Sequence, residues 1–245
     1  MIQFLSSLLP ALLLLAFIYW KDKNREPLPM VMKGVWYGFL CVWIAVLLEL
    51  PLEFLYRQLL KGIPVVGPAF RGFIVAAVPE ESAKLLMLWL LLRKNKEFDE
   101  YLDGIVYAVA IGLGFAAFEN ITYVFGAQES WTGVAISRAL LAVPGHYAFA
   151  VLMGFFYSLY HFLPHQYAKS RYLILLLPVI AHGIYDMLLF ICMESGNAVR
   201  VVILIMLIVF VVRMHKYCYK RIGILAQLDQ DKVHTGKFIL AMNQE

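Results

Sequence analysis

Charged residues are scarce in this chain: only 16% of its 245 residues are Asp, Glu, Lys or Arg, whereas 62% are hydrophobic. In soluble domains roughly a quarter of the residues are charged and about half are apolar. With a mean hydropathy of +0.74, an ordinary water-soluble fold is excluded, because a domain of this length could not bury so much apolar surface. A membrane protein exposes that surface to lipid, so composition predicts an integral membrane protein.

Cysteine is also rare, with three isolated residues at Cys41, Cys192 and Cys218. Without a CxxC pair, no disulfide framework can be inferred. The HExxH pattern of zinc proteases is absent as well. The net charge is +4, but the basic residues form short flanks beside apolar runs. They report membrane topology, and no basic domain or nucleic-acid partner is predicted.

Long apolar runs are what the sequence has in abundance. Seven of them are long enough to cross about 30 Å of hydrocarbon, and Pro51 and Pro79 are expected to kink or break their helices. The runs cover residues 3–20, 34–56, 70–92, 104–125, 138–162, 172–193 and 198–215. The predicted fold is an all-α, polytopic membrane helix bundle of about seven transmembrane helices over residues 1–215. A cytoplasmic tail follows over 216–245, which we expect to be solvated or disordered, with an interfacial helix as the alternative.

The distribution of Lys and Arg predicts how the chain crosses the membrane. Fifteen of these residues fall on one side of the seven runs and five on the other, with Lys84 inside the third run. Because basic residues concentrate in cytoplasmic loops, the N-terminus is predicted outside and the C-terminus in the cytoplasm. The first run has no basic segment before it and no small-residue cleavage site, so a retained span is expected rather than a signal peptide.

Several ionisable residues lie inside the apolar runs, where a charge costs a few kcal/mol or more. With a rise of about 1.5 Å per residue, the acidic and histidine residues among them fall about 9 to 15 Å from the outer ends of four helices. Acid–base chemistry, metal binding and ion transport would each require such a shared layer. The ionisable residues are Glu80, Glu81, Lys84, Glu119, His146, His182 and Asp186.

The spacing within this layer suggests how the side chains are arranged. Adjacent Glu80 and Glu81 lie about 100° apart on a helix, so at most one faces a shared centre. Lys84 can neutralise either one as an intrahelical ion pair, which leaves the other to act as a general base. His182 and Asp186 are one turn apart and share a face. Asp186 can therefore fix the imidazole tautomer, or form a simple packing hydrogen bond.

Other residues of the fourth and fifth runs allow two interpretations each. Asn120 can donate to a developing oxyanion or hydrogen-bond another helix. His146 alone is more often a satisfied polar residue than a ligand. Small residues in the fourth run permit close helix approach, and we expect them to pack this helix against the 70–92 helix. They are Gly112, Gly114, Ala116 and Ala117.

At these residues the sequence resembles the PrsW family of bacterial intramembrane proteases, relatives of the CAAX-processing and bacteriocin-immunity proteases. The resemblance runs in order from about residue 70 to 190, and the combination of motifs is specific although no single piece is. The matching stretches are 80–84 (EESAK), 98–107 (FDEYLDGIVY), 112–120 (GLGFAAFEN), 144–146 (PGH) and 181–186 (AHGIYD).

The resemblance implies a multi-pass protease of the bacterial plasma membrane. Its substrate would be a single-span anti-sigma factor, cut on the extracytoplasmic side to activate a sigma factor in the envelope-stress response. By matching position, the implied catalytic residues are Glu80, Glu81, Glu119, His146 and His182. The supporting residues are Lys84, Asn120 and Asp186.

The predicted chemistry is peptide-bond hydrolysis by a water that Glu80 or Glu81 activates, with His146 and His182 completing the site. A metal-free site is favoured, because nothing at helical spacing forms a two-His metal motif. In the alternative, His146, His182 and Glu119 hold Zn²⁺ with an open position for water. The alternative function is a proton- or ion-coupled transporter using the same side chains, although no inverted repeat or pair of broken helices supports it.

Overall fold

The computed structural model describes the backbone of residues 1–242 and the side chains of residues 1–232, and over these residues it is all helical. Within this part, six helical stretches are long and apolar enough to cross a membrane. They are α1 (Ile2–Lys21), α2 (Leu28–Leu59), α5 (Asp103–Gly126), the stretch Gln128–Phe162, α8 (Ser170–Glu194) and α9 (Asn197–Met242) up to Lys232. The Gln128–Phe162 stretch consists of η2 (Gln128–Ser130), α6 (Trp131–Ser137), η3 (Arg138–Ala142) and α7 (Val143–Phe162).

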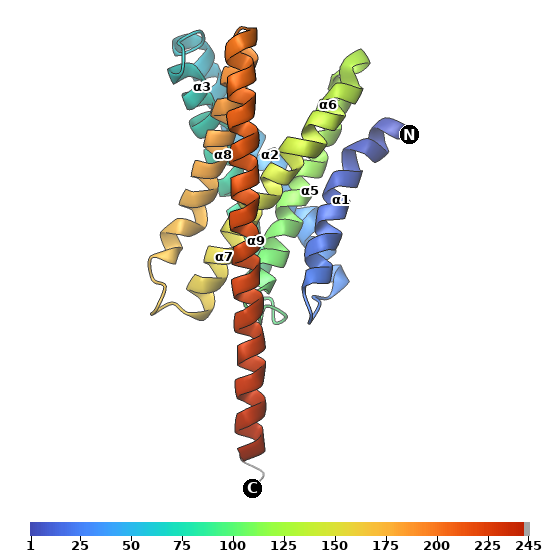
Figure 1. Cartoon of the computed structure of the whole chain (residues 1–245), viewed down its shortest axis with the longest axis vertical. Coiled ribbons are helices and arrows are strands. Elements are labelled where there is room, and N and C mark those ends of the chain that lie inside the picture. The colour runs from blue at the N-terminus through green and yellow to red at the C-terminus, as the bar shows by residue number, and fades with distance from the viewer. Residues whose placement is uncertain (243–245) are drawn as a thin grey trace.

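A further helical stretch covers residues 66–92, where the third apolar run was predicted. It consists of α3 (Val66–Phe70), η1 (Arg71–Ala77) and α4 (Val78–Leu92). It is not one of the six candidate spans, because Glu80, Glu81 and Lys84 interrupt its apolar sequence. Figure 1 shows the long helices running between two ends of the bundle, with the N-terminus and α3 at one end and the C-terminus beyond the other.

The centre of the bundle is formed by α5 and α7, most of whose residues are buried. α1, α2 and α7 pack against α5, while α8 and α9 pack against α7. By contrast, the outer helices α1, α2 and α9 expose many large apolar side chains. Lipid is the solvent that such a surface requires. The bundle therefore buries its polar residues and exposes apolar ones.

Glycines bring α5 close to its neighbours, but not to the neighbour that the sequence suggested. A Cβ atom on Gly114 would overlap the carbonyl oxygen of Val35 in α2, and one on Gly112 would lie 2.7 Å from the Cβ of Ala150 in α7. The prediction that these small residues pack α5 against the 70–92 helix is therefore wrong. They face α2 and α7, since composition reveals that a helix can approach closely but not which partner it meets.

Two π-helical turns, η1 and η3, interrupt the helices, and each ends two residues before a proline, Pro79 or Pro144. Proline donates no N–H and its ring clashes with the carbonyl group four residues earlier, so the helix opens into a wider turn. The helix continues through Pro79 without a break, and Pro51 lies inside the continuous α2. The two wide turns lie within one helical turn of Glu80 and His146 in the chain.

The last helix, α9, continues without a break to Met242. The expectation of a disordered tail is therefore wrong for residues 216–242, which are helical, while 243–245 lie outside the described part. Ile222 and Leu225 of α9 are buried, and the carboxylate of Asp229 accepts the N–H groups of Tyr101 at 2.7 Å and Leu102 at 2.9 Å. These contacts hold α9 against the loop before α5, which the polarity of the tail did not reveal.

Candidate active site

A cavity of about 700 Å³ lies between the helices that carry the predicted polar layer. Side chains from α4, α5, α7 and α8 line it, and five of them belong to the predicted site. These are Glu80, Glu119, His146, His182 and Asp186. Together with Glu81, Lys84 and Arg138, which contact them, we call these residues the active-site cluster. The structure brings the layer together as expected, while the catalytic role of each residue stays a prediction.

Lys84 holds the two adjacent glutamates. Its ammonium group donates to Oε2 of Glu80 at 3.2 Å and to Oε1 of Glu81 at 2.7 Å. Glu80 lines the cavity, whereas Glu81 is fully buried and does not. Only one glutamate thus faces the shared centre, as the angle between adjacent helical residues requires. The expectation that Lys84 would leave one glutamate unpaired is wrong, because the ammonium group reaches both.

Carboxylates hold both sides of the His182 ring. Its Nδ1 lies 3.0 Å from Oε1 of Glu81, and its Nε2 lies 3.3 Å from Oδ2 of Asp186 and 4.0 Å from Oε2 of Glu80. The ring also stacks on Phe149, with 4.7 Å between the ring centroids. Such contacts fix the orientation of an imidazole. The predicted pairing of His182 with Asp186 is present.

His146 joins two ion pairs across the cavity. Its Nδ1 lies 3.2 Å from the ammonium nitrogen of Lys84, and its Nε2 lies 2.9 Å from Oε2 of Glu119. The same oxygen of Glu119 accepts a hydrogen bond from Nη2 of Arg138 at 2.7 Å. The rings of His146 and His182 are 5.4 Å apart between centroids. One connected network of charges therefore surrounds the cavity.

A group of donors suited to a metal ion lies within this network. Glu80, His146 and His182 are buried, and each offers one ligand atom within 4.8 Å of the other two. Two imidazoles and one carboxylate form a donor set of catalytic zinc sites, in which a fourth position stays open for water. The predicted set had Glu119 as the carboxylate. Glu80 takes this place, since Arg138 and His146 hold Glu119.

Sequence reasoning missed several charged residues that line the cavity, among them Glu49 and Arg138. Glu49 lies within an apolar run, so the criterion that found the other acids applies to it too. Arg138 stands at the start of a run and was counted with the loop charges. Asn120, in contrast, lies outside the cavity lining: its amide donates to the carbonyl oxygen of Ser7 at 2.9 Å and accepts from Arg138 at 2.6 Å. Of its two predicted roles, the structure shows the bond between helices.

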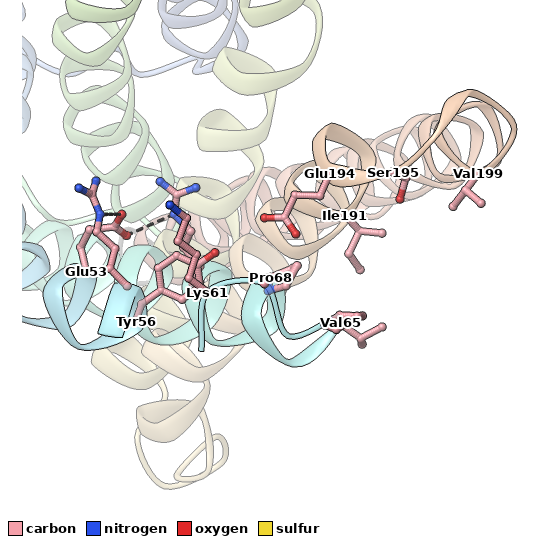
Figure 2. A pocket seen from close by; sticks show the side chains of 13 residues that line it. Glu53, Tyr56, Lys61, Val65, Pro68, Ile191, Glu194, Ser195 and Val199 are labelled. Atoms are coloured by element: carbon pink, nitrogen blue, oxygen red, sulfur yellow. Dashed lines mark hydrogen bonds and ion pairs between the residues drawn. The ribbon is translucent and has the colours of Figure 1, made fainter. Parts of the chain in front are cut away.

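A second pocket of about 840 Å³ adjoins the cavity and shares Glu53, Arg57 and Arg71 with it. In Figure 2, Glu53 accepts hydrogen bonds from both arginines, at 2.8 Å from Arg57 and 3.2 Å from Arg71. Lys61 and Glu194 also line this pocket. It lies where α2, α3, α8 and α9 meet, at the end of the bundle that holds the N-terminus (Figure 1). The cavity and the second pocket therefore meet at the three charged residues that they share.

Comparison with known proteins agrees with this arrangement. Residues 26–213 match the PrsW family of intramembrane metalloproteases. The chain is 38% identical over 184 residues to Protease PrsW of Geobacillus kaustophilus. This match covers 74% of this chain and 76% of the relative. It is 34% identical over 218 residues to Protease PrsW of Clostridioides difficile, and this match covers 87% of this chain and 89% of the relative. For Protease PrsW of Bacillus subtilis the identity is 35% over 183 residues, and the match covers 74% of this chain and 79% of the relative. No solved structure matches the chain.

The helical bundle, its apolar exterior and these matches define a multi-pass membrane protein of the intramembrane protease class. More closely, the chain belongs to the PrsW family. The resemblance seen in the sequence motifs is thereby confirmed. Membership of a protease family favours the protease over the transporter, the alternative that the buried charges had left open.

Proposed function

We propose that this protease hydrolyses a peptide bond with the help of a zinc ion held by Glu80, His146 and His182. The observation that carries the proposal is the grouping of these three donors beside a cavity. It reverses the metal-free preference, which rested on the lack of a two-His motif within one helix. The fold supplies one histidine from α7 and one from α8. The description of the family as metalloproteases supports the same chemistry.

The donor set fits zinc at the expense of one existing contact on each ring, since Nε2 of His182 must leave Oδ2 of Asp186, which lies 3.3 Å away. Because Nδ1 of His146 faces Lys84 and Nε2 faces Glu119, the ring can bind a metal only by giving up one of these bonds. Lys84 keeps Glu81 as its partner at 2.7 Å, so release of its contact with His146 leaves the ammonium group paired. Bound zinc supplies a Lewis acid that polarises the scissile carbonyl and activates water.

The other residues of the active-site cluster position and complement these donors. Glu81 accepts the Nδ1 hydrogen of His182, which leaves Nε2 on the side of Asp186 and Glu80; we assign Glu81 as a positioning residue. Glu119 lines the cavity and is proposed to accept the proton of the attacking water. Arg138 uses only two of its five N–H groups, on Asn120 and Glu119. The others are available to stabilise negative charge on the substrate oxygen.

The proposed substrate is a single-span anti-sigma factor cut on its extracytoplasmic side, with activation of a sigma factor as the outcome. Support comes from the family resemblance and from the position of the second pocket, through which the cavity meets the N-terminal end of the bundle. The distribution of Lys and Arg assigns that end to the outside.

For the membrane topology we propose seven spans, with residues 66–92 as the third. This stretch is continuous and helical between the two ends of the bundle. Its three internal charges pair with one another and with the histidines rather than facing lipid. Such pairing is how membrane helices accommodate charge. An odd number of spans puts the two termini on opposite sides of the membrane, and the distribution of Lys and Arg favours the N-terminus outside and the C-terminus in the cytoplasm.

Metal analysis tests the zinc proposal. The purified wild-type protein is expected to hold one zinc ion per chain by mass spectrometry, to lose activity on exhaustive chelation and to regain it on addition of zinc. His146→Ala and His182→Ala should lose the metal together with the activity. His165→Ala, in an exposed loop, is the matched control and should keep both. Activity that survives complete removal of zinc would overturn the proposal in favour of glutamate chemistry.

Co-expression tests the substrate. Each single-span anti-sigma factor of the host is produced with a cytoplasmic tag, with the wild-type protease or with the His182→Ala variant. A shortened, membrane-bound fragment should appear only with the wild type, and its new terminus should map to the extracytoplasmic side. Cleavage at a cytoplasmic site, or no cleavage of any anti-sigma factor by a protease active on another substrate, would contradict the substrate assignment.

A further inference from the structure

A second group of buried acids lies apart from the active-site cluster. Asp22 follows α1, Glu26 precedes α2 and Asp103 is the first residue of α5. Their exposed fractions are 2%, 4% and 0%. One oxygen atom from each lies within 4.8 Å of those of the other two. We call this group the acidic site; Asp103 belongs to the 98–107 motif, for which the protease chemistry gives no use.

Two oxygen atoms of the acidic site have no hydrogen-bond partner. Oδ2 of Asp103 accepts the N–H groups of Asp99 at 3.1 Å and Glu100 at 2.7 Å, while its buried Oδ1 accepts none. Oδ1 of Asp22 accepts the N–H group of Asn24 at 3.0 Å, and its buried Oδ2 again has no partner. Buried polar atoms without a partner are rare in folded proteins, and an unplaced ion is one explanation.

No cation among the described side chains balances these charges. Among the side chains described, no Lys, Arg or His forms an ion pair with the acidic site. The nearby ammonium group of Lys232 donates instead to the carbonyl oxygen of Asp99 at 2.7 Å. The Tyr107 hydroxyl donates a hydrogen bond to Glu26, a neutral contact that adds no positive charge to the site. Buried charges without a partner cost several kcal/mol each, so the site requires a counter-charge.

The electrostatics of the loop agree with this requirement. Burial raises the pKa of Asp22 to about 6, and burial, together with the carboxylate of Asp22, raises the pKa of Glu26 to about 7. A divalent cation would offset this cost of burial and satisfy the unpartnered oxygen atoms at the same time.

We propose that Asp22, Glu26 and Asp103 bind one hard divalent cation, Mg²⁺ or Ca²⁺. All three ligands are carboxylates, which suit these ions, whereas the site offers no imidazole or thiolate that would favour zinc. The cation joins the loop between α1 and α2 to the start of α5. Its role is structural: it fixes the central helix α5 relative to the two helices packed beside it. This site is independent of the proposed protease chemistry.

Thermal unfolding of the purified full-length protein in detergent tests the site. After chelation, addition of MgCl₂ or CaCl₂ should raise the melting temperature by about 5 °C or more at saturation, with one cation bound per chain by calorimetry. The two salts distinguish the ions. Asp103→Asn and Asp22→Asn each keep the shape of the side chain and its existing hydrogen bond. Either change should weaken binding at least tenfold and abolish the shift in melting temperature.

Two controls separate this site from its surroundings. Asp99→Asn makes the same chemical change on an exposed side chain of the same loop, and it should keep the full cation-dependent shift. His182→Ala removes a zinc ligand from the active-site cluster and should also keep it. No shift and no bound Mg²⁺ or Ca²⁺ in the wild type, or an undiminished shift in Asp103→Asn, would overturn the proposal.

Discussion

Two buried polar clusters in one bundle differ in how their charge is balanced. In the active-site cluster the chain provides the cations itself, since Lys84 and Arg138 contact its carboxylates. The acidic site has no cation among the described side chains. The first cluster borders a cavity, whereas the second is sealed beneath loops. A cluster that must remain charged while substrates enter and leave needs permanent partners, but a sealed one can take an ion from solution as the chain folds.

The two clusters also differ in where their residues stand along the helices. Members of the active-site cluster lie within helices, and two of them, Glu80 and His146, follow a π turn and a proline within four residues. Residues of the acidic site lie at helix ends and in one loop. A wide turn positions a side chain at one point of a continuous helix. Loop residues hold their position less well, so binding of an ion contributes more to the stability of the acidic site.

The largest expected effect is on catalysis. Glu80→Gln removes a proposed ligand and should lower kcat by about 10³- to 10⁴-fold, whereas Glu81→Gln acts through His182 and should lower it about 10- to 100-fold. Single-turnover cleavage of a single-span substrate measures both. Glu97→Gln, on an exposed loop, is the control and should be active, as should Asp103→Asn once its folded fraction is matched. Equal losses in Glu80→Gln and Asp103→Asn would erase the distinction between the clusters.

A second prediction removes the buried lysine from the active-site cluster, so that its glutamates lack a positive partner as the acids of the acidic site do. Lys84→Met leaves Glu80 and Glu81 without their buried cation, so the zinc-free protein should lose about 3 kcal/mol of stability. Addition of zinc should restore part of the loss, because the ion replaces the missing positive charge. Denaturant titrations with and without zinc measure the effect. Lys94→Met, at an exposed position, should change stability by less than about 0.5 kcal/mol.

The contrast between the clusters also decides what the sequence could reveal. A charge inside an apolar run is conspicuous, which is why Glu80, His146 and His182 were found from their depth alone. Asp22 and Asp103 stand at helix ends, where charges are ordinary, and only the packing of loops shows that they are buried. Seven apolar runs were enough to predict the helical bundle. The choice of Glu80 over Glu119 beside the histidines depends on the pairing with Arg138, which spacing within a helix does not contain.

A third prediction tests whether a change of packing at the start of α5 affects the acidic site more than the active-site cluster. A Cβ atom on Gly154 of α7 would overlap the carbonyl oxygen of Gly104, the residue after Asp103. Gly154→Ala should therefore push the start of α5 away and cost about 1 to 3 kcal/mol of stability. Cation affinity at the acidic site should fall more than proteolytic rate. Gly133→Ala, where nothing lies within 4 Å of the added Cβ atom, is the control; equal effects of the two variants would contradict the close contact.

The smallest effect on function should come from variants that report only on which side of the membrane each cluster opens. Ser195→Cys lies in the second pocket and Lys94→Cys in the exposed loop after α4, so neither should change activity more than about twofold. The background lacks the buried native cysteines Cys41, Cys192 and Cys218. In intact cells a membrane-impermeant thiol reagent should label Ser195→Cys, whereas Lys94→Cys should be labelled only after the cells are opened. The reverse pattern would invert the proposed topology, and it would place the cavity on the cytoplasmic side and the acidic site outside.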